Sequence, residues 1–112
     1  MSQLDELLVK YKKDLKEMGE AVDADLLKAV AKGLGPSIYN KDSSTVAGSD
    51  KSELATVKNN FLIKKLGLSE SDSLDEAIDQ VLTKYGKSKS NKYRVVVYYL
   101  LTKHFGKESV YA

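Results

Sequence analysis

The chain has 112 residues, of which 42% are hydrophobic and 30% are charged, and this is the size and composition of one soluble globular domain. Its formal net charge of +2 is too small to indicate a nucleic-acid partner by itself. The sequence contains no cysteine, which excludes disulfides, thiolate zinc sites and thiol nucleophiles.

Three features of the sequence predict a cytoplasmic protein that makes no contact with a membrane. The absence of cysteine suits a reducing compartment. The chain turns acidic at Asp5 and Glu6, which is unlike a secretory signal or a transit peptide. The longest uncharged apolar run, 95–102, has eight residues, whereas about 18 are needed to cross a bilayer.

Two helices are expected in the first third of the chain. Apolar residues recur every three or four positions from Leu4 to Met18, which gives a helix one hydrophobic face, and Gly19 ends it. Asp23 is a good N-cap for a second, short helix that ends at Gly33. Glycine ends helices because it adopts a left-handed backbone without a Cβ clash, and a preceding cation suits the negative helix end. A basic residue is followed by glycine in this way at Lys32-Gly33, Lys65-Leu66-Gly67, Lys84-Tyr85-Gly86 and His104-Phe105-Gly106.

Residues 34–48 are predicted to form one long structured loop. Gly35-Pro36 blocks a helix on both sides, and several turn-forming residues follow it. Ile38, Tyr39 and Val46 are the apolar residues available to pin the loop to the core. A loop of this length in a small domain packs as a compact unit or carries function.

Two further helices follow the loop, and a capping pair predicts where each begins. Asp50 with Glu53 opens the third helix, which ends at Gly67. Ser73 with Glu76 opens the fourth helix, which continues to the next glycine.

The segment 94–101 fits either a strand or a helix. It is rich in β-branched and aromatic residues, as a strand would be. Apolar residues nevertheless keep helical spacing from Tyr93 to Phe105, Asn91 is a fair N-cap, and a lone strand would have no evident partner. We therefore favour a helix that is apolar nearly all round and central in the fold.

These elements together predict an all-α fold. The chain is expected to be one compact domain, 1–112, in which a bundle of about five helices carries the long structured loop 34–48.

No residue of the sequence is assigned a catalytic, cofactor-binding or metal-binding role, and no cofactor is expected. His104 is the sole histidine, and a place at a helix end explains it. The positive end of the fourth helix explains the acidic residues Asp72, Asp75, Glu76 and Asp79, which lack the spacing of a calcium loop. The glycines of 33–37 lack the partners that define phosphate-binding loops. The sequence therefore favours a protein that is not an enzyme.

A basic segment at the junction of the fourth and fifth helices, 84–94, is the strongest electrostatic feature. Lysines that lead into a helix N-terminus can contact phosphates, and interleaved tyrosines can stack on bases. Tyr85 and Tyr93 also fit the core pattern, however, so a solvated junction is the simpler interpretation. The residues that would contact nucleic acid are Lys84, Lys87, Lys89, Lys92 and Arg94.

Four segments of the chain resemble a family of small bacterial proteins of unknown function. They read KGLGPSIYNKD at 32–42, NFLIKKLGL at 60–68, NKYR at 91–94 and YYLL at 98–101. The first is the most specific, and the similarity covers nearly the whole chain. The resemblance implies a compact, mainly helical cytoplasmic protein, and it carries over no activity, cofactor or catalytic residue.

The leading hypothesis is a non-enzymatic helical module that binds a protein partner or associates with itself. Tyr39, Asn40 and Lys41 of the loop are its expected contact residues. One alternative is a nucleic-acid-binding module that uses 84–94, which predicts binding that weakens steeply with salt. Another is a small-molecule enzyme, which would require a polar pocket around His104 and several tyrosines.

Overall fold

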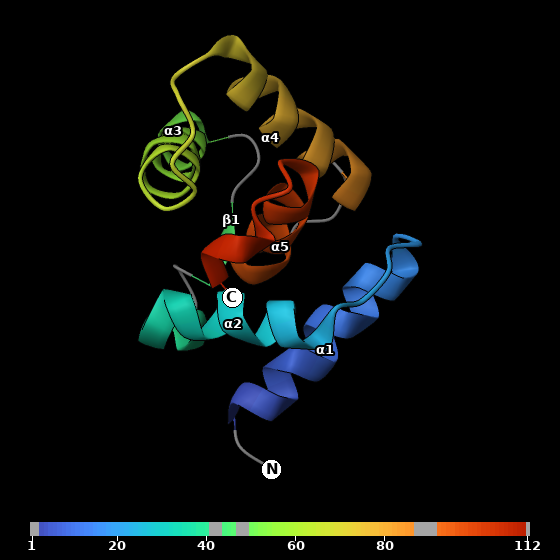
Figure 1. Ribbon diagram of the computed structural model, residues 1–112. Coiled ribbons are helices and arrows are strands. Elements are labelled where there is room, and N and C mark those ends of the chain that lie inside the picture. The colour runs from blue at the N-terminus through green and yellow to red at the C-terminus, as the bar shows by residue number, and fades with distance from the viewer. Residues whose placement is uncertain (1–2, 41–43, 47–49, 87–91, 112) are drawn as a thin grey trace.

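A computed structural model of the chain describes residues 3–40, 44–46, 50–86 and 92–111, apart from the side chain of Asp72. Within these ranges, helices dominate and the two strands are very short (Figure 1). The elements in chain order are α1 (Gln3–Glu17), α2 (Ala24–Leu34), the 3-10 helix η1 (Gly35–Tyr39), β1 (Thr45–Val46), α3 (Lys51–Thr56), the π-helix η2 (Val57–Ile63), α4 (Asp72–Tyr85), β2 (Lys92–Tyr93), α5 (Arg94–His104) and the 3-10 helix η3 (Glu108–Tyr111). The predicted all-α fold is confirmed. The radius of gyration, 13.0 Å, is that of a compact domain of about 100 residues.

Helix α5 forms the centre of the core. Its residues from Arg94 to Thr102 are all buried, and it packs against α1, α2 and α4 (Figure 1). A helix that is apolar all round requires neighbours on each side, and these three helices provide them. The helix favoured for 94–101 is therefore confirmed. The helix begins at Arg94, later than expected, and Tyr93 is the residue that precedes its first turn. Asn91, the expected N-cap, lies outside the described residues.

Part of the predicted loop 34–48 forms regular structure. The 3-10 helix η1 runs directly through Gly35-Pro36, so the loop opens with a helical turn. Strand β1 then pairs antiparallel with β2, with Thr45 opposite Tyr93. The carbonyl of Ser44 accepts a hydrogen bond from the backbone N–H of Arg94, at 2.9 Å. This pairing fixes the loop to the start of α5.

Two of the three apolar residues expected to pin the loop are buried. Ile38 is 4% exposed and Val46 is 1% exposed. Tyr39 is instead 48% exposed, because it is the last residue of η1 and its side chain lies at the surface.

Helix α2 begins as predicted and ends later than predicted. The carboxylate of Asp23 accepts a hydrogen bond from the N–H of Leu26, at 3.1 Å, which confirms the N-cap. The helix continues through Gly33, and the residue after its end is Gly35, whose φ of +66° only glycine adopts readily. The glycine at 33 lies inside the helix, where an added Cβ atom would come within 3.4 Å of the Tyr111 ring.

The third and fourth helices also differ from the prediction. Asp50 caps α3 as expected, accepting from two N–H groups of the first turn at 3.0 and 3.4 Å. The chain then leaves α-helical geometry at Val57 and continues as the π-helix η2, which was not predicted. The expected start of α4 was wrong. The helix begins earlier, after Ser71, so Ser73 and Glu76 lie inside it and form no capping box.

Candidate functional site

Two hollows lie beside α5, and each is lined by residues from separate parts of the chain. The smaller, which we call the aromatic cleft, has a volume of about 180 Å³ and lies between α2, η2, α5 and η3. Its lining residues are Gly33, Leu34, Asn60, Phe61, Lys65, Tyr98 and Tyr111.

Two aromatic contacts form the walls of the aromatic cleft. The rings of Phe61 and Tyr98 stack, with centroids 3.9 Å apart and planes inclined by 13°. The ammonium of Lys65 lies 5.1 Å from the centre of the Tyr111 ring, which is a cation–π distance. Burial, and to a lesser extent the nearby Tyr98, raises the pKa of Tyr111 from its ordinary value to about 12. The cleft therefore offers ring faces beside one ammonium group.

The π-helix η2 supplies Asn60 and Phe61 to the aromatic cleft. Near its end the hydrogen bonds span five residues, from the N–H of Lys64 to the carbonyl of Asn59 at 3.3 Å and from the N–H of Leu66 to that of Phe61 at 2.9 Å. π-helices are rare and often occur at functional sites. Sequence reasoning missed this one because no residue type or spacing marks the wider turn.

The guanidinium of Arg94 holds Tyr98, and hence one wall of the aromatic cleft, in place. It forms an ion pair with Glu53 and donates hydrogen bonds to the Tyr98 hydroxyl and the Thr45 carbonyl, each at 3.3 Å. These partners come from α3, α5 and β1, so one side chain joins three elements. Arg94 is 8% exposed, and this buried set of contacts gives it a structural role.

The described cations of the basic segment 84–94 do not form one exposed surface for nucleic acid. Lys92 is 5% exposed and Arg94 is 8% exposed, because the pairing of β2 and the contacts of Arg94 turn both side chains inward. Lys84 is exposed at the end of α4. Lys87 and Lys89 lie outside the described residues.

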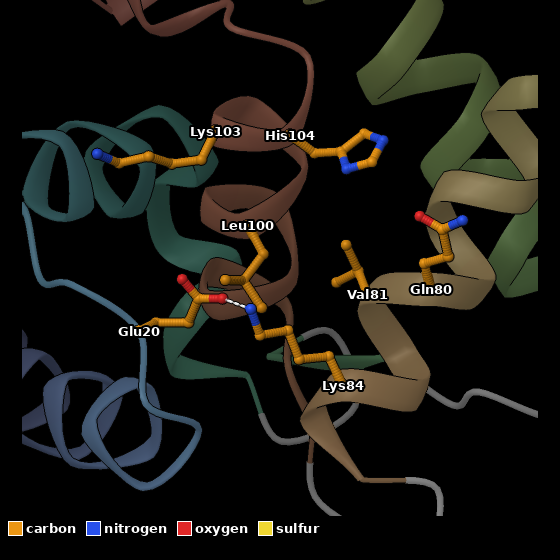
Figure 2. Close-up of a pocket in the computed structure, with 7 residues that line it drawn as sticks. All are labelled: Glu20, Gln80, Val81, Lys84, Leu100, Lys103 and His104. Atoms are coloured by element: carbon orange, nitrogen blue, oxygen red, sulfur yellow. Dashed lines mark ion pairs between the residues drawn. The ribbon is translucent and has the colours of Figure 1, made fainter.

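The larger hollow, which we call the ion-pair groove, has a volume of about 360 Å³ (Figure 2). It lies between α4, α5 and the linker that joins α1 to α2. Its lining residues are Glu20, Gln80, Val81, Lys84, Leu100, Lys103 and His104.

An ion pair between Lys84 and Glu20 closes one side of the ion-pair groove. The Lys84 side chain is 53% exposed and that of Glu20 is 26% exposed. The linker that carries Glu20 is fixed to α5, because the Tyr99 hydroxyl donates to the Ala21 carbonyl at 2.9 Å and accepts from the Asp23 N–H at 2.8 Å. The carboxylate thus comes from an anchored segment, whereas the ammonium ends a long, partly exposed side chain.

The remaining residues of the ion-pair groove give it an apolar floor and a polar far side. Val81 and Leu100, each 6% exposed, form the floor. In Figure 2, His104 and Gln80 lie across the groove from the ion pair. The side chain of Lys103 leaves α5 in the direction opposite to His104, and its ammonium lies 5.8 Å from the centre of the Tyr99 ring.

The charged residues that line the ion-pair groove with His104 are two lysines and one acid, Glu20, which is already paired with Lys84. That arrangement gives His104 no carboxylate among the lining residues to orient it as a catalytic base.

The residues expected to contact a protein partner are partly described. Tyr39 is 48% exposed and Asn40 is exposed, whereas Lys41 lies outside the described residues. In the described part of the chain, Tyr39 and Val9 are the large hydrophobic residues left exposed.

The part of the chain that can be described contains neither a cluster of metal ligands nor a membrane-spanning helix. No three histidine or carboxylate side chains there converge as metal ligands. At the start of α4, Asp75 instead forms an ion pair with Lys58 at 3.1 Å, and Lys58 is also paired with Glu70. No helix in the described ranges has the length and apolar character required to span a bilayer.

A family model described as "Protein of unknown function (DUF2853)" matches residues 10–109. The chain belongs to this family. No curated protein matches the chain. All the residues that line the aromatic cleft of this DUF2853 protein, except Tyr111, lie within the matched range.

Proposed function

We propose that this DUF2853 protein is a non-enzymatic helical module that binds a protein partner, and that the aromatic cleft accepts one large apolar side chain of that partner. The observation that carries the proposal is a hollow walled by stacked rings and a π-helix, to which separate segments of the chain contribute. The volume of about 180 Å³ is below the range of about 300–1,000 Å³ of small-molecule sites, which suits one side chain better than a whole small molecule.

The charge around the aromatic cleft specifies the kind of partner. Lys65 is the charged residue among those that line it, and its ammonium lies 5.1 Å from the centre of the Tyr111 ring. A segment with a carboxylate beside its apolar side chain would complement this cation. We therefore propose an acidic partner segment.

Tyr39 and Asn40 remain proposed as additional contacts. Both are exposed, and Tyr39 belongs to η1, which directly follows the lining residue Leu34 in the chain. Aromatic residues are enriched at protein interfaces because a ring supplies much contact area with little loss of rotamer entropy. In the self-associating form of the proposal, a second copy of the chain provides the acidic segment.

A peptide titration followed by NMR tests the aromatic cleft directly. The probe is acetyl-Glu-Phe-Glu-amide, and the matched controls are acetyl-Glu-Ala-Glu-amide and acetyl-Lys-Phe-Lys-amide. We expect the probe to shift the amide resonance of the Asn60 side chain and those of the cleft backbone at lower concentration than either control. Equal shifts with all three peptides, or shifts that avoid the cleft, would contradict the proposal.

A charge reversal separates the aromatic cleft from the rest of the surface. Lys65→Glu should weaken binding of the acidic probe by about two- to fivefold, the effect of one exposed charge contact. Lys10→Glu, which reverses an exposed lysine on α1, is the control and should leave binding unchanged. Sedimentation of the unliganded chain over a wide concentration range tests self-association, and a dimer that Lys65→Glu dissociates would identify the second copy as the partner.

A further inference from the structure

We propose that the ion-pair groove is a second binding site, independent of the aromatic cleft, that binds a small organic carboxylate with an aliphatic body. In the proposed complex the ammonium of Lys84 leaves Glu20 and binds the carboxylate of the ligand. The aliphatic body of the ligand lies on Val81 and Leu100.

The size of the groove supports a small molecule as its occupant. Small-molecule sites have volumes of about 300–1,000 Å³, and the ion-pair groove, at about 360 Å³, lies within this range. Its apolar floor and charged edge match a ligand with one apolar end and one charged end (Figure 2). A ligand without an apolar part would leave the floor in contact with water.

The ion pair indicates the sign of the charged end. The backbone that follows Glu20 is anchored, because the Tyr99 hydroxyl donates to the carbonyl of Ala21 and accepts from the N–H of Asp23. Lys84 is more than half exposed and has four rotatable side-chain bonds, so its ammonium can turn from Glu20 to a ligand without any backbone change. Carboxylate replaces carboxylate in this exchange, and the ammonium keeps an anionic partner throughout.

Helix ends favour a singly charged carboxylate over a phosphate. Lys84 lies in the last turn of α4, and Lys103 and His104 lie in the last turn of α5. The carbonyl groups at these ends carry a partial negative charge, which repels a dianion more strongly than a monoanion. The groove also lacks a helix N-terminus of the kind that binds phosphate.

The sole histidine of the chain provides a specific probe of the groove. Because His104 lines the groove and no other histidine is present, the imidazole C–H resonances report this site alone. Titration with sodium hexanoate at neutral pH and constant ionic strength should move these resonances along a saturating curve. Hexanamide, which has the same chain and no charge, should bind at least about threefold more weakly, and inorganic phosphate should produce no saturating shift.

Two substitutions should change hexanoate affinity in opposite directions. Lys84→Gln removes the proposed partner of the carboxylate and should weaken binding about two- to fivefold. Glu20→Gln removes the competitor for Lys84 and should strengthen binding by a similar factor. The controls Lys13→Gln and Glu6→Gln change exposed residues of α1 in the same way and should leave affinity unchanged.

These outcomes decide the proposal without reference to the aromatic cleft. Equal binding of hexanoate and hexanamide would overturn it, and so would weaker binding to Glu20→Gln. Lys65→Glu, which tests the aromatic cleft, should not alter hexanoate affinity, so failure at one site is distinguishable from failure at the other. All of the substituted side chains are at least partly exposed, and circular dichroism confirms that each variant is folded.

Discussion

The hydroxyl of Tyr85 donates a hydrogen bond to the carboxylate of Asp14, which lies 71 positions earlier in the chain. Both residues are buried, at 5% and 7% exposed. The same hydroxyl accepts a hydrogen bond from the backbone N–H of Tyr93, at 3.1 Å. One side chain therefore connects the end of α4 to α1 and to β2. Burial, and then the bond to Asp14, raises the pKa of the Tyr85 hydroxyl above its ordinary value.

Removing this hydroxyl should destabilise the fold. Tyr85→Phe takes from the buried Asp14 carboxylate one of its donors, and we expect the free energy of unfolding to fall by about 1–3 kcal/mol. Urea denaturation followed by circular dichroism measures the change. Tyr39→Phe, at an exposed tyrosine, is the matched control and should change stability by less than about 0.5 kcal/mol. A loss no larger than that of the control would show that the hydrogen bond contributes little.

The same substitution at Tyr11 should have the opposite result. Tyr11 is fully buried, and among the described residues its hydroxyl has no hydrogen-bond partner. Because an unsatisfied buried hydroxyl is unfavourable, Tyr11→Phe should leave stability unchanged or raise it by up to about 2 kcal/mol. The edge-on contact with the Tyr93 ring, at a centroid separation of 5.1 Å, needs no hydroxyl and should persist. A clear loss of stability would reveal a partner for this hydroxyl.

Stability should decline at alkaline pH because the fold raises the pKa of two tyrosine hydroxyls. Burial first, and then the nearby Tyr93 and Tyr39, raises the pKa of Tyr11 to about 12, and the pKa of Tyr111 is raised to about 12 as well. In the unfolded chain these hydroxyls ionise near pH 10, so above that pH the folded state holds more protons than the unfolded state. The stability from this difference is complete below pH 10 and is lost as pH rises toward 12. Urea denaturation at a series of pH values, with tyrosine ionisation followed by absorbance, should show a shallower decline in Tyr11→Phe.

The fold class was predictable from local features of the sequence. Helical spacing of apolar residues depends on neighbours three or four positions apart, and the caps at Asp23 and Asp50 depend on residues two or three positions away. The β-branched segment 94–101 forms a helix because three other helices surround it, so burial on every side outweighs strand propensity.

The candidate sites depended on contacts between distant segments and were not predictable in the same way. Arg94 and Lys92 belong to a segment whose composition predicted a basic surface. Arg94 is instead buried beside Glu53, which lies 41 positions earlier in the chain. The groove was missed because Glu20 and Lys84, 64 positions apart in sequence, meet only after α1, α4 and α5 have packed together. The π-helix that shapes the aromatic cleft has no residue signature at all.

Two neighbouring glycines provide a test of where α2 ends. Gly35 has a φ of +66° and a ψ of −147°, and a Cβ atom there would meet nothing within 4 Å, so any effect of Gly35→Ala comes from the backbone. We expect this variant to lose about 1–3 kcal/mol of stability. Gly33 has no positive φ, and its added Cβ atom would lie in ordinary contact with the Tyr111 ring, at 3.4 Å.

Gly33→Ala should therefore be neutral or gain up to about 1 kcal/mol, because alanine favours a helix interior over glycine. Thermal and urea denaturation of the two variants, each compared with the unmodified chain, measures the difference. The larger variant Gly33→Leu should displace the Tyr111 ring, which a change in the fluorescence of the tyrosines would report. If Gly33→Ala were instead the more damaging of the two alanine variants, the helix would end at Gly33, as the basic residue before it first indicated.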